Sequence, residues 1–210
     1  DNALSPGLLR ALADDPPGAP WYGFVRVHEQ LADEGFCRRL RASGCVLLKL
    51  GLESGSQAVL DAMAKGIRLE LMERTLAALS RAGIATYVYL LFGTPSESLE
   101  EARQTLDFTR RHHRAITFLN LAVFNMPVAS DEAAELPGTG FSDGDLSLYR
   151  DFVHPRGWDR RAVRTFLDRE FKRQPEIAAI LRRDPLLFTS NHAALFTGHF
   201  SGLDGENLKT

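Results

Sequence analysis

A carboxylate stands where an apolar run gives way to a loop. Residues 46–52 are mostly apolar, Glu53 follows them, and the small residues at 54–56 lead into a helical pattern. This order predicts a strand, an acid, a tight loop and a helix. Ligands bind at the carboxyl ends of strands in parallel sheets, so Glu53 is a candidate ligand-binding group.

Further polar and aromatic side chains recur on one face of the predicted strands. Alternation along residues 46–53 places Lys49 beside Glu53 and puts large apolar side chains opposite, namely Val46, Leu48, Leu50 and Leu52. Three more strands are predicted at 24–28, 84–92 and 116–124. They add Arg26, His28, Tyr87, Tyr89 and Asn120 to the polar face.

A parallel sheet buried on both faces normally reads as nearly continuous Val, Ile and Leu. The mixed pattern instead favours a barrel or half-barrel whose interior holds a polar ligand. The alternative is a solvated face, or structural ion pairs such as Lys49 with Glu53.

Helical patterns separate these strands. They are predicted at residues 7–13, 33–43, 57–65, 70–82 and 99–112, with the pair Ser98 and Glu101 forming a capping box for the last. Alternating strands and helices predict an α/β fold: a partial TIM-barrel-like parallel sheet of about four βα units over residues 1–129.

The chain changes character after residue 129. Residues 130–145 read as a linker loop, and residues 146–210 as an α-helical C-terminal extension. Helices are predicted there at 146–153, 158–173, 175–183 and 187–196. An apolar stripe on the second of them is expected to pack on the barrel, formed by Val163, Phe166, Leu167 and Phe171.

Composition narrows the possible partners and location. The formal net charge of −2 gives no reason to expect nucleic acid or an anionic membrane, and no apolar run has the length of a membrane span. Cys37 and Cys45 lack a Cys-x-x-Cys spacing, which favours buried free thiols in a reducing cytoplasm. The pair His112–His113 suits a helix end, and we assign no metal ligand.

Two motifs at matching distances carry a family resemblance. Residues 49–57 (KLGLESGSQ) continue through Val59, Leu60, Met63 and Lys65–Gly66, and residues 82–84 (AGI) are followed by residues 93–98 (GTPSES). This pattern resembles the latter part of a radical SAM core. It is most similar to the cobalamin-binding and related subgroups, and it covers about residues 1–129.

The resemblance implies that S-adenosylmethionine (SAM) lies across the carboxyl ends of the strands. It implies contacts of Glu53 and Ser54 with the ribose or methionyl part, and of Arg26 with the carboxylate of SAM. It places adenine against Gly93, Thr94, Pro95, Val123 and Asn125. The substrate would then face His28, Lys49, Tyr87, Tyr89 and Asn120, and no catalytic residue is assigned.

One departure from the family is large. The Cys-x-x-x-Cys-x-x-Cys motif that binds the family's [4Fe-4S] cluster is absent. We therefore expect a C-terminal portion of a longer protein, inactive alone, whose N-terminal part is its partner and carries the cluster and possibly cobalamin. The edge that this partner would cover could otherwise support a homodimer.

Two other functions stay open at this point. One is a barrel enzyme of the lyase or aldolase type that uses Lys49 and Glu53 as a base or Schiff-base pair. The other is a non-catalytic interaction domain that docks through the helices from residue 158 onward.

Overall fold

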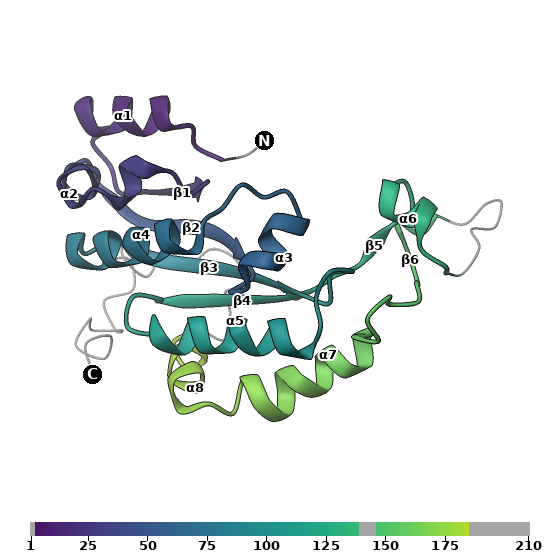
Figure 1. The fold of residues 1–210 in the computed structure, drawn as a ribbon. Helices are drawn as coiled ribbons and strands as arrows, with labels where there is room; N and C mark the ends of the chain where they lie inside the picture. The colour runs from purple at the N-terminus through teal and green to yellow at the C-terminus, as the bar shows by residue number, and fades with distance from the viewer. Residues whose placement is uncertain (1–2, 139–145, 185–210) are drawn as a thin grey trace.

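A four-stranded parallel sheet forms the centre of the molecule (Figure 1). The computed structural model describes residues 3–138 and 146–184. The sheet order is β1-β2-β3-β4, formed by β1 (Trp21–Val25), β2 (Cys45–Glu53), β3 (Ala85–Phe92) and β4 (Phe118–Val123). Neighbouring strands follow each other in the chain and are all parallel, so each connection crosses back through a helix. The predicted α/β partial barrel is confirmed.

Most helices of the βα units lie close to their predicted ranges, whereas the short helix at 29–32 was not predicted. They are α1 (Pro6–Asp14), η1 (Glu29–Ala32), α2 (Glu34–Ala42), α3 (Gln57–Ala62), α4 (Leu69–Ala82) and α5 (Leu99–Arg111). The capping box of Ser98 and Glu101 is present at the start of α5. Gly83 ends α4 in the left-handed conformation, with φ of 72°. The predicted helix 57–65 is shorter, ending at Ala62.

The C-terminal part adds a small arm and a helical layer (Figure 1). In the arm, β5 (Met126–Pro127) pairs antiparallel with β6 (Tyr149–Arg150), and α6 (Asp131–Glu135) lies between them in sequence. The helical layer consists of α7 (Arg160–Phe166), the π-helix η2 (Leu167–Phe171) and α8 (Pro175–Leu181). Figure 1 shows this layer on the α5 side of the sheet.

One apolar core joins the sheet to the helical layer. The helix-facing side chains of β2 and β3 are fully buried, namely Leu48, Leu50, Leu52, Val88, Leu90 and Phe92. The Phe92 ring lies 5.3 Å from Phe171 and 6.2 Å from Phe166, measured between ring centroids. The apolar stripe of the extension therefore packs on the barrel, as predicted.

Two sequence predictions about strand faces were wrong. The first strand runs over 21–25 and not 24–28, because the chain turns after Val25 into η1, with His28 at its N-cap. The register shifts between Trp21 and Tyr22, which pair with Cys45 and Leu47. This irregularity turns Val46 away from the helices and into the smaller core on the opposite face.

The predicted helix at 146–153 was also wrong. Residues 149–150 form β6 because their backbone pairs with β5. Leu146 and Leu148 beside it are largely exposed, so no apolar face drives a helix there. The predicted helix at 187–196 and linker residues 139–145 lie outside the described residues, and the rest of the linker contains α6.

The free edge of β1 is partly occupied. The Leu4 amide donates to the Phe24 carbonyl at 2.7 Å, and Leu4 forms an isolated parallel bridge with Val25. Dimerisation through this edge stays a prediction. Within 3–138 and 146–184, every helix is too short or too polar to cross a bilayer.

Candidate functional site

Glu53 ends β2 in an unusual conformation. Its φ of 67° is rare for a residue with a side chain, and the β2–β3 register shifts between Gly51 and Glu53. A Cβ atom added to Gly51 would lie 3.1 Å from the Glu53 Oε1 atom. The carboxylate therefore folds back over Gly51, into space that the glycine leaves free.

The surroundings of this carboxylate leave it accessible. The Lys65 Nζ atom lies 3.3 Å from Glu53 Oε1, and the Glu53 side chain is 21% exposed. Arg26 follows Val25, whose β2 partner is Leu50, so Arg26 leaves β1 at the level of Gly51. A carboxylate and the Lys65 cation thus lie at the carboxyl end of β2, and Arg26 follows the carboxyl end of the neighbouring strand β1.

The loop after Glu53 is anchored to α5. The Ser54 hydroxyl lies 3.1 Å from Thr105 Oγ1 and accepts a hydrogen bond from the Ser56 amide. The Gly55 amide donates to Thr105 Oγ1 at 2.9 Å. Ser54 is fully buried, and its hydroxyl serves this anchor.

Lys49 lies among aromatic rings on the polar face of the sheet. Its Nζ atom is 4.8 Å from the ring centroid of Phe24, 5.2 Å from Tyr22 and 5.9 Å from Tyr87. Such contacts stabilise a cation near ring faces, while burial lowers the pKa of Lys49. Tyr22 and Phe24 are both 41% exposed, so the wall they form is open to a ligand.

The aromatic wall extends across the sheet. The Tyr89 ring lies 5.3 Å from Phe24 and 4.9 Å from Tyr87, and Phe118 lies 6.1 Å from Tyr87. Burial raises the pKa of Tyr87 and raises that of Tyr89 to about 12, so both phenols stay protonated. The Tyr87 hydroxyl hydrogen-bonds Asn120, which brings three of the predicted substrate residues together.

His28 does not share this face. It begins η1 beyond the end of β1, so strand alternation no longer applies to it. Its Nε2 atom is buried with no hydrogen-bond partner among the described residues. Burial, followed by the positive charge of Arg10, lowers the pKa of His28. The prediction that His28 shares the polar strand face was therefore wrong.

The loop after β3 is organised around a buried carboxylate. The Gly93 amide donates to Glu97 Oε2 at 2.5 Å, and the Trp158 indole N–H donates to the same oxygen at 2.9 Å. Glu97 is fully buried, and its Oε1 atom has no hydrogen-bond partner within the described chain. Burial raises the pKa of Glu97 to about 7.

Gly93 itself is required by packing. Its φ is 82°, and an added Cβ atom would lie 3.1 Å from Val163 Cγ2 on α7. The missing side chain therefore makes room for α7, whereas the sequence had suggested room for adenine.

His154, which is buried, contacts the backbone of the same loop. Its Nε2 atom lies 2.9 Å from the Thr94 carbonyl, and its Nδ1 atom lies 3.2 Å from the amides of Arg156 and of Trp158. Two amide donors at Nδ1 assign the neutral tautomer with the proton on Nε2, and burial lowers the pKa of His154. The Thr94 side chain is buried and Pro95 is half-buried.

A small cavity lies between β3, β4 and this C-terminal segment. Its volume is about 50 Å³, enough for very few water molecules and too small for an adenine ring. The lining includes three residues predicted to edge adenine, Gly93, Val123 and Asn125, together with His154, Trp158 and Arg160. Arg160 hydrogen-bonds the Asn125 side chain.

Sequence reasoning missed several of these residues. Tyr22 was missed because the first strand was started too late, and Phe24, the first residue of the predicted strand, was given no role. Glu97 was part of a recognised motif without an assigned role. His154 and Trp158 carry no local signal, because their partners lie about 60 positions earlier.

The two cysteines do not form a cluster site. Cys37 and Cys45 are fully buried on the helix side of the sheet. Burial raises the pKa of Cys37 to about 11 and that of Cys45 to about 12, so both stay thiols. Over 3–138 and 146–184, no three His, Cys, Asp or Glu side chains come together as metal ligands.

Comparison with known proteins gives the class of this segment. The model of the radical SAM superfamily matches residues 24–109, which include Glu53 and Gly93. This part of the chain therefore resembles a portion of a radical SAM domain, as the motifs had suggested. No curated protein matches the chain.

Three solved structures of two enzymes are similar in fold. The radical SAM methyltransferase TsrM from Kitasatospora setae, solved with tryptophan and a SAM analogue, is 21% identical, with a TM-score of 0.51. Another TsrM structure contains cobalamin and a [4Fe-4S] cluster. HemN, the coproporphyrinogen III oxidase from Escherichia coli, is 17% identical, with a TM-score of 0.52.

These likenesses cover only part of each relative. They span 66% of this chain and 30% of the first TsrM chain, and 77% of this chain and 36% of HemN. The chain thus spans about a third of the length of the enzymes it resembles.

Proposed function

We propose that this chain supplies the SAM-binding and substrate-facing part of a radical SAM enzyme. The observation that carries the proposal is the Glu53 carboxylate, which folds over Gly51 at the carboxyl end of β2 and stays partly exposed. A carboxylate there can accept hydrogen bonds from ribose hydroxyls or from the methionine ammonium. Residues outside this chain would hold the [4Fe-4S] cluster, and the chain alone is expected to be inactive.

Charge complementarity supports this assignment. The amino acid end of SAM carries an ammonium and a carboxylate, and Glu53 and Arg26 offer the opposite charges at adjacent strand ends. The segment Gly93, Thr94 and Pro95, with Ser54, Val123 and Asn125, would border the nucleoside. Bound to a cluster, SAM would supply either a 5′-deoxyadenosyl radical, formed with one electron from the cluster, or, with cobalamin, a methyl group.

The polar face of the sheet would receive the substrate. Tyr22, Phe24, Tyr87 and Tyr89 provide flat apolar surfaces around the Lys49 cation. Asn120 adds an amide beside Tyr87. This set of side chains suits a substrate with a planar apolar part and an anionic group.

The test is SAM binding to the Glu53→Gln variant by isothermal titration calorimetry. Loss of the charge-assisted hydrogen bonds is expected to weaken SAM binding about tenfold or more. Folding stability should change by less than about 0.5 kcal/mol, because the side chain is partly exposed and its ion pair with Lys65 is near the surface. The matched control is Glu100→Gln, an exposed carboxylate on α5. Equal SAM affinity in wild type and Glu53→Gln would remove the basis of the proposal.

A lyase or aldolase is the second candidate function. It is favoured by Lys49, because burial lowers the pKa of this amine and so raises the neutral fraction that attacks a carbonyl. Borohydride reduction in the presence of pyruvate would leave a covalent adduct on Lys49, detectable by peptide mass spectrometry. Absence of an adduct on Lys49, with Lys49→Arg as the blank, would count against this function.

The structure removes the surface through which a non-catalytic interaction domain was expected to dock. The stripe of Val163, Phe166 and Phe171 is buried against the sheet, so it is not available to a partner.

A further inference from the structure

The loop between β3 and α5 is held by residues about 60 positions later in the chain. His154 Nε2 donates to the Thr94 carbonyl at 2.9 Å, and the Arg156 guanidinium donates to the Ser96 carbonyl at 2.6 Å. Arg156 also pairs with Glu101 at 2.9 Å. We call residues 154–158 the clamp. Its contacts reach the loop backbone at two points and the first turn of α5 at a third.

Glu97 connects the clamp to Gly93. A single oxygen, Oε2, accepts both the Gly93 amide and the Trp158 indole N–H. The carboxyl group is fully buried, and these two donors are what offset its loss of hydration. Removal of the indole donor would leave the Gly93 amide as the remaining donor to this oxygen. The position of the Glu97 carboxylate, and with it the hydrogen bond of the Gly93 amide, would therefore change.

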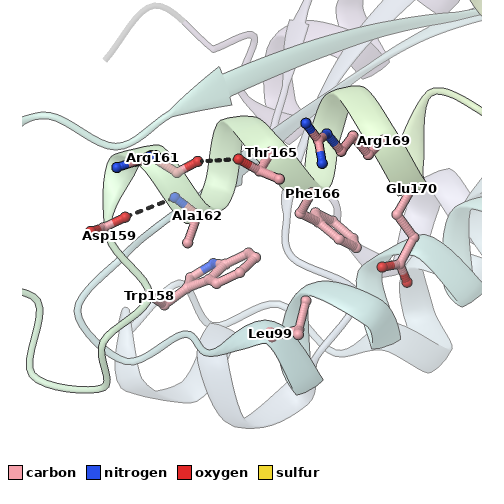
Figure 2. A pocket seen from close by; sticks show the side chains of 9 residues that line it. All are labelled: Leu99, Trp158, Asp159, Arg161, Ala162, Thr165, Phe166, Arg169 and Glu170. Atoms are coloured by element: carbon pink, nitrogen blue, oxygen red, sulfur yellow. Dashed lines mark hydrogen bonds between the residues drawn. The ribbon is translucent and has the colours of Figure 1, made fainter.

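Trp158 is itself fixed by the helical layer. Its amide donates to His154 Nδ1 at 3.2 Å, and its ring meets Phe166 edge-on, 5.7 Å between centroids. Figure 2 shows the indole lying between the start of α7 and Leu99 of α5. Asp159, the next residue, caps α7 through the Ala162 amide at 2.7 Å. The position of the indole is therefore set by α7.

The same helix touches Gly93 directly. Val163, one turn into α7, fills the space where a side chain at Gly93 would lie. The helical layer thus reaches this glycine by two routes, one through Val163 and one through Trp158 and Glu97.

We propose that the clamp sets the conformation of residues 93–95 for SAM binding, with Glu97 as the positioning residue that links Trp158 to Gly93. This inference rests on the proposed function, because it takes SAM as the ligand of the loop. It assigns to the C-terminal layer a role in cofactor affinity in addition to its packing role.

The experiment compares two matched substitutions. Trp158→Phe keeps an aromatic ring and removes the N–H that Glu97 accepts. Trp21→Phe is the control, since the Trp21 indole donates to the Ser43 carbonyl at 3.1 Å, at the opposite end of the sheet. Two quantities are measured in the full chain: hydrogen exchange of the Gly93 amide by NMR, and the Kd for SAM by calorimetry.

Trp158→Phe is expected to speed exchange at Gly93 about tenfold and to raise the Kd for SAM about tenfold, whereas Trp21→Phe changes neither. Arg156→Gln, which removes the contacts with Ser96 and Glu101, should shift both quantities in the same direction by a smaller factor. The Arg156→Gln variant can still test the proposal if Trp158→Phe does not fold.

The outcomes separate the inference from the proposed function. Unchanged Gly93 exchange in both clamp variants would overturn the clamp, whether or not SAM binds. Faster exchange with an unchanged Kd would overturn the positioning role. A wild-type chain that binds no SAM would overturn the proposed function, and with it SAM as the ligand of the loop, while the exchange difference would still report on the clamp itself.

Discussion

The loops after β2 and β3 start from similar sequence and end in different structures. Each follows a strand, passes a glycine near its end and continues through serines into a helix. After β2, Glu53 is partly exposed and pairs with a lysine 12 residues away. After β3, Glu97 is fully buried and depends on Trp158 from the C-terminal layer.

The difference shows that burial by the C-terminal layer, more than local sequence, decides whether a carboxylate after a strand can contact a ligand. Glu53 is partly exposed to solvent and can contact a ligand. Glu97 is shielded from water, accepts hydrogen bonds from two protein donors and has a structural role. Loss of hydration destabilises the charged form of Glu97 and therefore raises its pKa.

The largest expected effect comes from removing the support beneath the β3 loop. Phe171→Ala empties a fully buried site beside Phe92 and Phe166. It should lower the free energy of unfolding by about 3–5 kcal/mol, measured by urea denaturation. Leu148→Ala, at a largely exposed position of the arm, is the control and should stay within about 0.5 kcal/mol of wild type. A similarly small change for Phe171→Ala would mean that the helical layer is not part of the core.

The second effect uses pH to sharpen the contrast between the two carboxylates. The pKa of Glu97 is raised from 4.5 to about 7 in the folded state, so folding binds a proton in this window. Stability should therefore fall by about 3 kcal/mol as pH rises from 4.5 through 7. Glu97→Gln should lack this part of the pH dependence.

The measurement is a set of denaturation curves between pH 4.5 and 8. Glu100→Gln serves as the exposed control and should follow the wild-type profile. If wild type and Glu97→Gln lose stability in parallel across this range, the folded-state pKa of Glu97 is not raised.

The smallest of the three effects concerns the loop after β2. A Cβ atom on Gly55 would lie 2.6 Å from Thr105 Cα and 2.8 Å from Phe108 Cβ. Gly55→Ala should therefore destabilise the fold by about 1–3 kcal/mol through overpacking, measured by thermal unfolding. Gly7→Ala, in α1 with no atom nearer than 3.9 Å, should be neutral or stabilising. Equal effects of the two substitutions would show that the loop does not rest on α5.

Much of the fold could be predicted because its signals are local. The Ser98–Glu101 capping box and the glycine after α4 lie within a few residues of the helix ends they define. Tyr87 and Tyr89 fall on the predicted face because β3 is regular. Glu53 was found because an apolar run ended beside it.

What could not be predicted depends on long-range contacts. A register shift at the start of β1 moved Val46 to the other face, and no residue type announces it. Residues 149–150 became a strand only because β5 was available to pair with them. His154 and Trp158 gained their roles from a loop far away in sequence.

The glycine at position 51 has a consequence for how this chain can vary. The Glu53 carboxylate lies next to the space that a side chain at Gly51 would occupy, so side chains at the two positions would compete for the same volume. Alanine at 51 would push the carboxylate aside by a few tenths of an ångström, and a larger side chain would displace it. Selection that maintains the acid therefore also maintains the glycine, and a lineage that lost Glu53 would be free to replace Gly51.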